Sequence, residues 1–162
     1  MIRSVLSCAM ILALLAQPAS AQERTVSIAR FGQIEISASS RGGVFLEGSD
    51  GVNAVSVFLT PQESVAWADS AEELANRRVP VPPRGEKNEY QVEPLILPRG
   101  SLTFERTLER GRDWFDISIA DKYVVNFLSI SLTRSEARRF VNAIRRAAAK
   151  VDSLRTVPGT AE

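Results

Sequence analysis

The chain has no histidine, and its only cysteine, Cys8, lies within the first ten residues. The lack of histidine excludes metal sites built on imidazole. It also excludes nucleophile pairs of the Ser-His-Asp and Cys-His kinds. No remaining side chain has an ordinary pKa near neutrality, so a general acid or base would be a shifted carboxylate, lysine or tyrosine. We therefore expect no cofactor, and a binding protein rather than an enzyme.

Long apolar runs are also lacking, apart from one near the start. Arg3 is followed by an apolar run over residues 5–16 and then by the small residues Ala19, Ser20 and Ala21. This is the order of a secretory signal peptide, and the run is shorter than the roughly 20 residues of a membrane span. The alternatives are a retained anchor or a lipid-modified Cys8. We expect a signal peptide over residues 1–21, export to the periplasm or cell exterior, and no membrane span in the mature chain.

Neither sign of charge predominates over the whole sequence, which has 20 basic and 19 acidic residues. Residues 22–98 contain seven basic and eleven acidic residues, whereas residues 99–162 contain twelve and eight. A uniformly basic nucleic-acid binder does not have this distribution. Two halves of opposite charge are expected to pair with each other, within one molecule or between two.

Two segments of the chain align without a gap. They are VSVFLTPQESVAWADSAEEL, residues 55–74, and LSISLTRSEARRFVNAIRRA, residues 128–147. Each begins with three alternating apolar residues, which predict a strand with one buried face. Each continues with a threonine and a glutamate three residues apart, Thr60 with Glu63 and Thr133 with Glu136, which predict a capping box at a helix start. A duplicated unit is the favoured interpretation.

The sequence predicts an α+β fold with two similar halves. The halves cover about residues 25–78 and 90–152, and each has three or four antiparallel strands followed by one helix, with the helices packed on one face of the sheet. A proline-rich connection over residues 78–89 joins them in a single domain of residues 22–155, followed by a disordered tail over residues 156–162. The predicted core comprises Val55, Val57, Leu59, Trp67, Leu74, Ile117, Ile119, Leu128, Ile130, Leu132, Phe140 and Ile144.

The joint between strand and helix resembles the last strand and helix of the PC4, Pur and Whirly nucleic-acid-binding families. The resemblance rests on Ile130-Ser131-Leu132-Thr133 with Glu136 and Phe140, and more weakly on residues 57–60 with Glu63 and Trp67. Those families are built from repeated units of four strands and one helix, so the resemblance implies that topology here. It also implies nucleic-acid binding, but the neutral charge and the signal peptide depart from the families.

The second predicted helix is rich in arginine. On a helical wheel its basic residues lie beyond both edges of the apolar stripe: Arg134, Arg138 and Arg145 on one side, and Arg139, Arg146 and Lys150 on the other. We interpret them as solvated flanks whose stems cover apolar neighbours. The alternatives are a grip on an acidic ligand, and contact with the acidic first helix, which carries Glu63, Asp69, Glu72 and Glu73.

The candidate site is the sheet face turned away from the helices. If Leu128, Ile130 and Leu132 face the helices, the alternate positions Tyr123, Val125 and Phe127 face away. The candidate residues of this face are Phe58, Arg106, Trp114, Asp116, Tyr123 and Phe127. Exposed aromatic side chains beside arginine would stack on bases or aromatic ligands, or would be buried in an interface.

We expect an exported binding or assembly protein that uses this aromatic face, with a second copy or another protein as its partner. The first alternative is a nucleic-acid or polyanion binder, although the neutral charge disfavours nucleic acid as a partner. The second is a carboxylate-dependent hydrolase, because Asp113, Asp116 and Asp121 lie around one predicted hairpin.

Overall fold

The computed structural model of the protein describes residues 23–109 and 111–155. Within these ranges there are nine strands and two helices. The strands form two antiparallel sheets, one of four strands and one of five. The predicted α+β class, with a helix after each group of strands, is confirmed. The predicted signal peptide over residues 1–21 and the predicted tail over residues 156–162 lie outside the described residues.

The first half is a four-stranded meander followed by a helix. Its elements are β1 (Thr25–Phe31), β2 (Ile34–Ser39), β3 (Gly43–Ser49), β4 (Ala54–Leu59) and α1 (Pro61–Asn76). The helix begins after Thr60, whose hydroxyl accepts a hydrogen bond from the Glu63 amide at 3.2 Å, while the Glu63 carboxylate accepts one from the Thr60 amide at 2.8 Å. The predicted capping box is therefore present, and proline follows where a missing amide hydrogen is tolerated.

The second half repeats this plan with one more strand. It comprises β5 (Lys87–Gln91), β6 (Leu95–Leu97), β7 (Gly100–Glu109), β8 (Arg112–Asp121), β9 (Phe127–Thr133) and α2 (Arg134–Arg155). The sheet order is β5-β7-β8-β9, and β6 pairs with the early part of β7. Thr133 and Glu136 form the equivalent cap, with the Thr133 amide donating to Glu136 at 2.9 Å.

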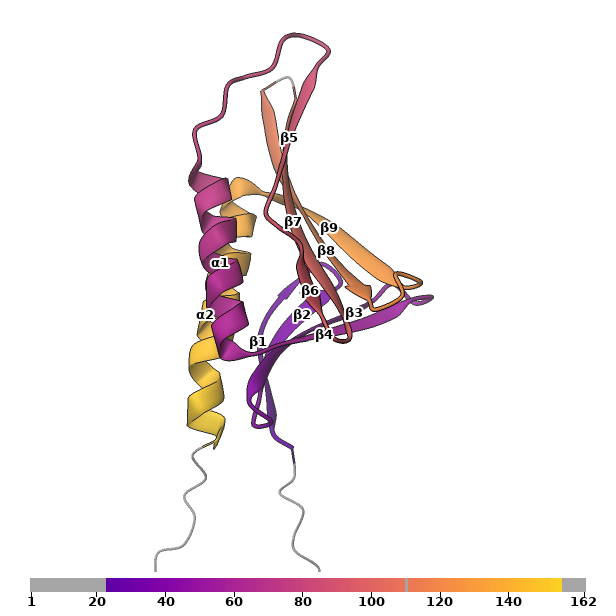
Figure 1. Ribbon diagram of the computed structural model, residues 1–162, viewed down its shortest axis with the longest axis vertical. Helices are drawn as coiled ribbons and strands as arrows, with labels where there is room; N and C mark the ends of the chain where they lie inside the picture. Colours follow the sequence, from indigo (N-terminus) through magenta and orange to yellow (C-terminus); the bar gives the residue numbers. More distant parts are fainter. Residues whose placement is uncertain (1–22, 110, 156–162) are drawn as a thin grey trace, which may run out of the picture.

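Each sheet turns one face toward the helix pair, and the core lies between them (Figure 1). Every predicted core residue is buried except Ile130, which is half-buried against the same cluster. Helix α2 packs on β1, β2 and β3 of the first sheet as well as on β8 and β9 of its own. The buried residues of both halves therefore form one continuous hydrophobic cluster.

A glycine of the first sheet leaves room for a residue of the second. A Cβ atom on Gly48, in β3, would lie 2.7 Å from Leu128 Cδ1 and 2.5 Å from the Gln33 carbonyl oxygen. This close approach brings the β3–β4 hairpin beside the β8–β9 hairpin. Both hairpins project to the same side of the molecule, away from the helices (Figure 1).

Candidate functional site

The outer face of the second sheet is mainly polar. The strand register places Trp114 and Asp116 on this face, with Glu105 and Ser131 opposite Asp116 on the neighbouring strands. The Trp114 Nε1–H donates to Asp116 at 3.1 Å, and the Ser131 hydroxyl donates to the other oxygen of the same carboxylate. Both oxygens of Asp116 are thus engaged within the sheet. Trp114 and Asp116 belong together, as predicted, but hydroxyl and carboxyl groups surround them rather than aromatic rings.

Arg106 is located in the core and not on the candidate face. It is 2% exposed and pairs with Asp113 through two hydrogen bonds, Nε to Oδ1 at 2.9 Å and Nη2 to Oδ2 at 3.1 Å. Its Nη1 donates to the carbonyl oxygens of Leu74 at 3.0 Å and Arg77 at 2.6 Å. Arg106 therefore binds carbonyls at the C-terminal end of α1, where a cation is favoured.

Asp113 joins this buried arginine to the start of α2. Arg134 Nε donates to Asp113 at 3.1 Å, in addition to the two bonds from Arg106. Burial raises the pKa of Asp113, but the hydrogen bonds and charges of the two guanidinium groups outweigh burial and hold the pKa below its usual value. Asp113 is thus a structural carboxylate in the described fold.

Phe58 is separate from the other predicted site residues. It lies on the outer face of the first sheet, where its ring packs edge-on against Phe45 with centroids 5.0 Å apart. A Cβ atom on Gly43 would lie 2.2 Å from the Phe58 ring, so the ring covers this glycine. Phe58 is half-buried on its own sheet.

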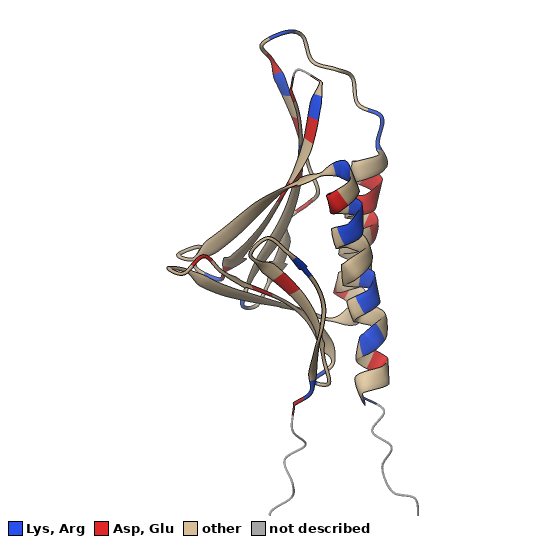
Figure 2. Cartoon of the chain, turned by 180° about the vertical axis from the view of Figure 1, so that it is seen from behind, with Lys and Arg blue, Asp and Glu red and all other residues tan. Residues whose placement is uncertain are grey.

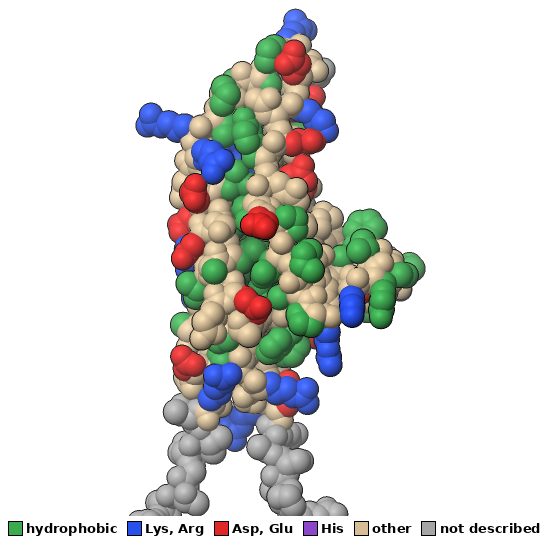
Figure 3. Space-filling view, in the orientation of Figure 1, with side chains coloured by type: hydrophobic (Ala, Val, Ile, Leu, Met, Phe, Trp, Pro, Cys, Tyr) green, Lys and Arg blue, Asp and Glu red, His purple; other side chains and the backbone are tan. Residues whose placement is uncertain are grey.

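Tyr123 and Phe127 lie at the end of the β8–β9 hairpin, together with other exposed apolar residues. Tyr123 belongs to the loop and not to the strand, because β9 begins at Phe127. Five side chains here and on the adjacent β3–β4 loop are between 58% and 91% exposed. We call this group the apolar tip: Val52, Tyr123, Val124, Val125 and Phe127. Hydrophobic side chains gather on this projection of the surface in Figure 3.

The two loops of the apolar tip have the same internal construction. Asp50 accepts hydrogen bonds from the amides of Val52 and Asn53 and from the Asn53 side chain, at 2.7–3.1 Å. Asp121 likewise accepts bonds from the amides of Tyr123, Val125 and Asn126 and from the Asn126 side chain, at 2.9–3.2 Å. The sequences DGVN and DKYVVN carry this signal, which the strand alternation around Tyr123 obscured.

These hydrogen bonds favour the ionised form of both aspartates. Backbone hydrogen bonds from Asn53 and Val52 lower the pKa of Asp50. Desolvation raises the pKa of Asp121, but the bonds from the Asn126 side chain and from three loop amides together lower it. Each loop therefore presents apolar side chains outward while its own carboxylate satisfies its amides.

Val124 has a backbone conformation that valine rarely adopts. Its φ is 55°, and it is the one non-glycine residue with a positive φ among residues 23–109 and 111–155. Its amide donates to the Asp121 carbonyl oxygen at 3.0 Å. A β-branched residue in the left-handed region is strained, and such strain concentrates at functional sites. The apolar tip is therefore the place where the described chain departs furthest from ordinary local preferences.

The charged residues concentrate along the helix pair and at the far end of the β5–β7 strands (Figure 2). Arg145 pairs with Asp69 at 2.7 Å and with Glu72 at 2.6 Å, and Arg138 donates to Asn76 at 2.6 Å. Arg145 of the basic half thus pairs with two carboxylates of the acidic half within one molecule. The alternative interpretation of the arginine-rich helix, contact with the first helix, is therefore correct for the flank of α2 that carries Arg138 and Arg145.

Two further findings concern the same described ranges. They contain no group of three or more Asp, Glu, His or Cys residues placed to hold a metal ion. They also contain no helix with the length and apolar character that crossing a membrane requires. Comparison with protein-family models and with curated protein sequences found no match to this chain.

Proposed function

We propose that this chain is an exported, non-enzymatic binding protein that inserts its apolar tip into an apolar cleft of another protein. The observation that carries the proposal is the gathering of five exposed apolar side chains at the ends of two adjacent hairpins. Exposed apolar patches of this kind mark interaction sites on soluble proteins. The leader-like start of the sequence supports export, and the lack of histidine supports binding rather than catalysis.

Burying the loops of the apolar tip in an interface costs little desolvation free energy. Asp121 satisfies the amides of Tyr123, Val125 and Asn126, so burying this loop leaves few unpaired donors. Burying each large apolar side chain contributes about 1.5–3 kcal/mol. Tyr123 adds an aromatic anchor, a residue type enriched at energetic centres of interfaces. The tip therefore combines apolar area with a loop that its own carboxylate has already ordered.

The size of the tip favours an enclosing partner over a second copy. A stable interface takes about 800 Å² and 20–30 residues from each side. Two tips meeting end to end would contribute only the five tip residues each, because both hairpins project away from the rest of the molecule (Figure 1). A convex tip gains enough area only when a concave surface surrounds it.

The charges beside the tip favour a protein over a lipid surface. Asp50, Asp121 and Lys122, together with Arg99 in the turn whose Gly100 pairs with Asp121, carry both signs without an excess of either. An anionic membrane attracts basic residues by about 1 kcal/mol each and repels acidic ones. The polar rim of a protein interface can match charges of both signs.

Site-specific photo-crosslinking tests the proposal. A photoreactive amino acid replaces Val52 in the tip or, as the control, Val81, which is 70% exposed in the α1–β5 connection. In cells that export the protein, we expect an adduct with a different protein from position 52 only. Val125→Asp should abolish the adduct, and the partner, identified by mass and purified, should bind the unmodified chain but not this variant.

Other outcomes of this experiment would contradict the proposal. An adduct with twice the mass of the chain would indicate a second copy at the tip. Equal adducts from positions 52 and 81 would indicate non-specific capture. Flotation of the purified chain with phosphatidylglycerol vesicles, lost in Val125→Asp, would indicate a membrane surface instead of a protein cleft.

A further inference from the structure

A groove of about 530 Å³ lies between α2 and the β1–β2 turn, away from the apolar tip. This volume is within the range of small-molecule sites. Its floor is apolar and consists of Ala29, Phe31 and Leu132, and its helix side carries Glu136, Arg139, Asn142 and Arg146. It shares no residue with the tip, so the two sites are independent.

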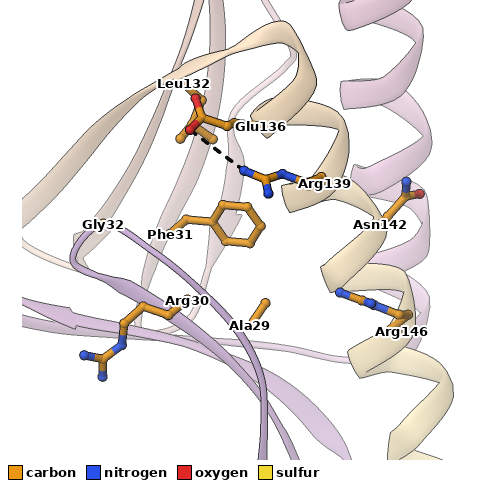
Figure 4. Close-up of a pocket in the computed structure, with 9 residues that line it drawn as sticks. All are labelled: Ala29, Arg30, Phe31, Gly32, Leu132, Glu136, Arg139, Asn142 and Arg146. Carbon is orange, nitrogen blue, oxygen red and sulfur yellow. Dashed lines mark ion pairs between the residues drawn. The ribbon is translucent and has the colours of Figure 1, made fainter.

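Figure 4 shows how these side chains are arranged. The Phe31 ring lies between the β1–β2 turn and α2, and Arg139 and Arg146 extend from the helix on either side of it. Arg30 points away from this space. Phe31 is held by an edge-on contact with Phe140, with centroids 5.1 Å apart. The groove therefore has an anchored aromatic floor between two guanidinium groups.

Arg146 differs from the other arginines of α2. Arg134 and Arg145 form ion pairs with carboxylates, and Arg138 and Arg155 donate hydrogen bonds to Asn76 and Gly42, respectively. Arg139 lies 3.9 Å from Glu136, whose other oxygen accepts the hydrogen bonds of the helix cap. Among the described residues Arg146 has neither an ion pair nor a side-chain hydrogen bond, so its charge is available to a ligand.

The spacing of the two groove arginines limits what can bind. Seven residues separate Arg139 from Arg146, which corresponds to about 10 Å along a helix. A single carboxylate could contact both guanidinium groups only if both side chains bent toward each other, whereas Figure 4 shows them extended on either side of Phe31. Because Glu136 already offsets the charge of Arg139, the anionic head belongs at Arg146 and the apolar body lies over Phe31 toward Arg139.

We infer that this groove binds a small amphipathic carboxylic acid, with its carboxylate on Arg146 and its apolar body on Phe31 and Leu132. A guanidinium group recognises a carboxylate through two parallel hydrogen bonds. The apolar floor then supplies the affinity that an exposed ion pair lacks.

The test compares two probes that differ only in their head group. Decanoate and decanol are titrated, below their aggregation limits, into the chain lacking residues 1–21, and binding is followed by amide NMR shifts of the groove residues. We expect saturable decanoate binding at the groove and at least tenfold weaker decanol binding, the loss expected for one charge-assisted contact.

Arg146→Gln removes the charge and keeps an unbranched polar side chain. It should weaken decanoate binding about tenfold and leave decanol binding unchanged. The matched control is Arg138→Gln, on the opposite flank of the same helix, which should change neither. Phe31→Leu keeps an apolar floor without the ring, and should weaken both probes while the unfolding transition shows that the fold is retained.

Three results would overturn the inference. One is an absence of saturable decanoate shifts at the groove. Another is equal affinity for the acid and the alcohol, which would show that Arg146 takes no part. The third is an equal loss of decanoate binding in Arg146→Gln and Arg138→Gln, which would show general attraction to a basic helix.

Discussion

Asp50 and Asp121 occupy equivalent positions in the two halves, and each carboxylate accepts hydrogen bonds from the asparagine that ends its own loop. The second loop is two residues longer, yet the backbone bond from aspartate amide to asparagine carbonyl closes both, at 3.2 and 3.0 Å. A shared arrangement that survives a change in loop length supports duplication more strongly than the strand–helix joint alone.

Replacing Asp121 with alanine should loosen the second loop only. Tyr123, Val125 and Asn126 would lose the acceptor of their amide protons, so their hydrogen exchange should become about tenfold faster for each lost bond. Amide exchange followed by NMR measures this change. Asp50→Ala is the matched control and should accelerate exchange at Val52 and Asn53 alone, whereas a spread of exchange into β8 would contradict a local role.

Replacing Val124 with asparagine should stabilise the protein. Asparagine tolerates the left-handed conformation that Val124 adopts at φ 55°, whereas a side chain such as valine is destabilised there by about 1–2 kcal/mol. Urea denaturation should show a gain in unfolding free energy of about 1 kcal/mol. Val125→Asn, at a neighbouring exposed position, should give no such gain. If the tip binds a partner as proposed, Val124→Asn should also reduce the photo-crosslinked adduct.

Asp113→Asn should destabilise the fold strongly. Arg106 is buried, and removing its carboxylate leaves the guanidinium charge without its partner, which costs about 3 kcal/mol in comparable buried pairs. Urea denaturation measures the loss. Asp116→Asn is the control, because its partners Trp114 and Ser131 are neutral. Arg106→Met also removes the bonds to the Leu74 and Arg77 carbonyls, so the double variant with Asp113→Asn should lose less than the sum of the two single losses, and strictly additive effects would contradict the pairing.

The same carboxylate should make stability depend on pH. Because the pKa of Asp113 is lowered in the folded state, the unfolded chain takes up its proton first as the pH falls. The contribution of Asp113 is therefore complete above the ordinary aspartate pKa of about 3.9 and is lost progressively below it. Urea midpoints measured from pH 7 down to pH 3 should fall more steeply for the natural chain than for Asp113→Asn.

The two capping threonines should contribute equally. Thr60→Ala and Thr133→Ala each remove the hydroxyl that accepts a helix amide, and each should lower the unfolding free energy by about 1 kcal/mol. The two losses should add in the double variant, since the caps share no partner. Ser70→Ala, inside α1, is the control and should have a smaller effect.

Local patterns were sufficient to predict much of the fold. Alternating apolar residues placed Val57 and Ile117 in the core, and the threonine–glutamate pairs located both helix starts. These signals act within a few residues, so the sequence displays them directly. The division of the strands into two sheets depends on which strands pair across the whole fold, and no local pattern displays this.

The candidate site could be predicted less well. Its residues depend on which side chains of each strand face inward and on where the loops begin and end. Leu102, Phe104 and Arg106 alternate in one phase, which places Arg106 inward, but a charged residue is normally expected outside. Its burial depends on Asp113 and on the carbonyls of α1, which are distant in sequence. Tyr123 continued the alternation of β9, yet Asp121 and Asn126 close a loop there.

The placement of α2 across both sheets has a consequence for how the protein unfolds. The helix of each half does not by itself cover the apolar face of that half, because α2 packs on β1, β2 and β3 as well as on β8 and β9. The two halves must then melt together in one cooperative transition. A protease cut between α1 and β5 would sever the chain without separating its pieces, and they would remain associated as a heterodimer.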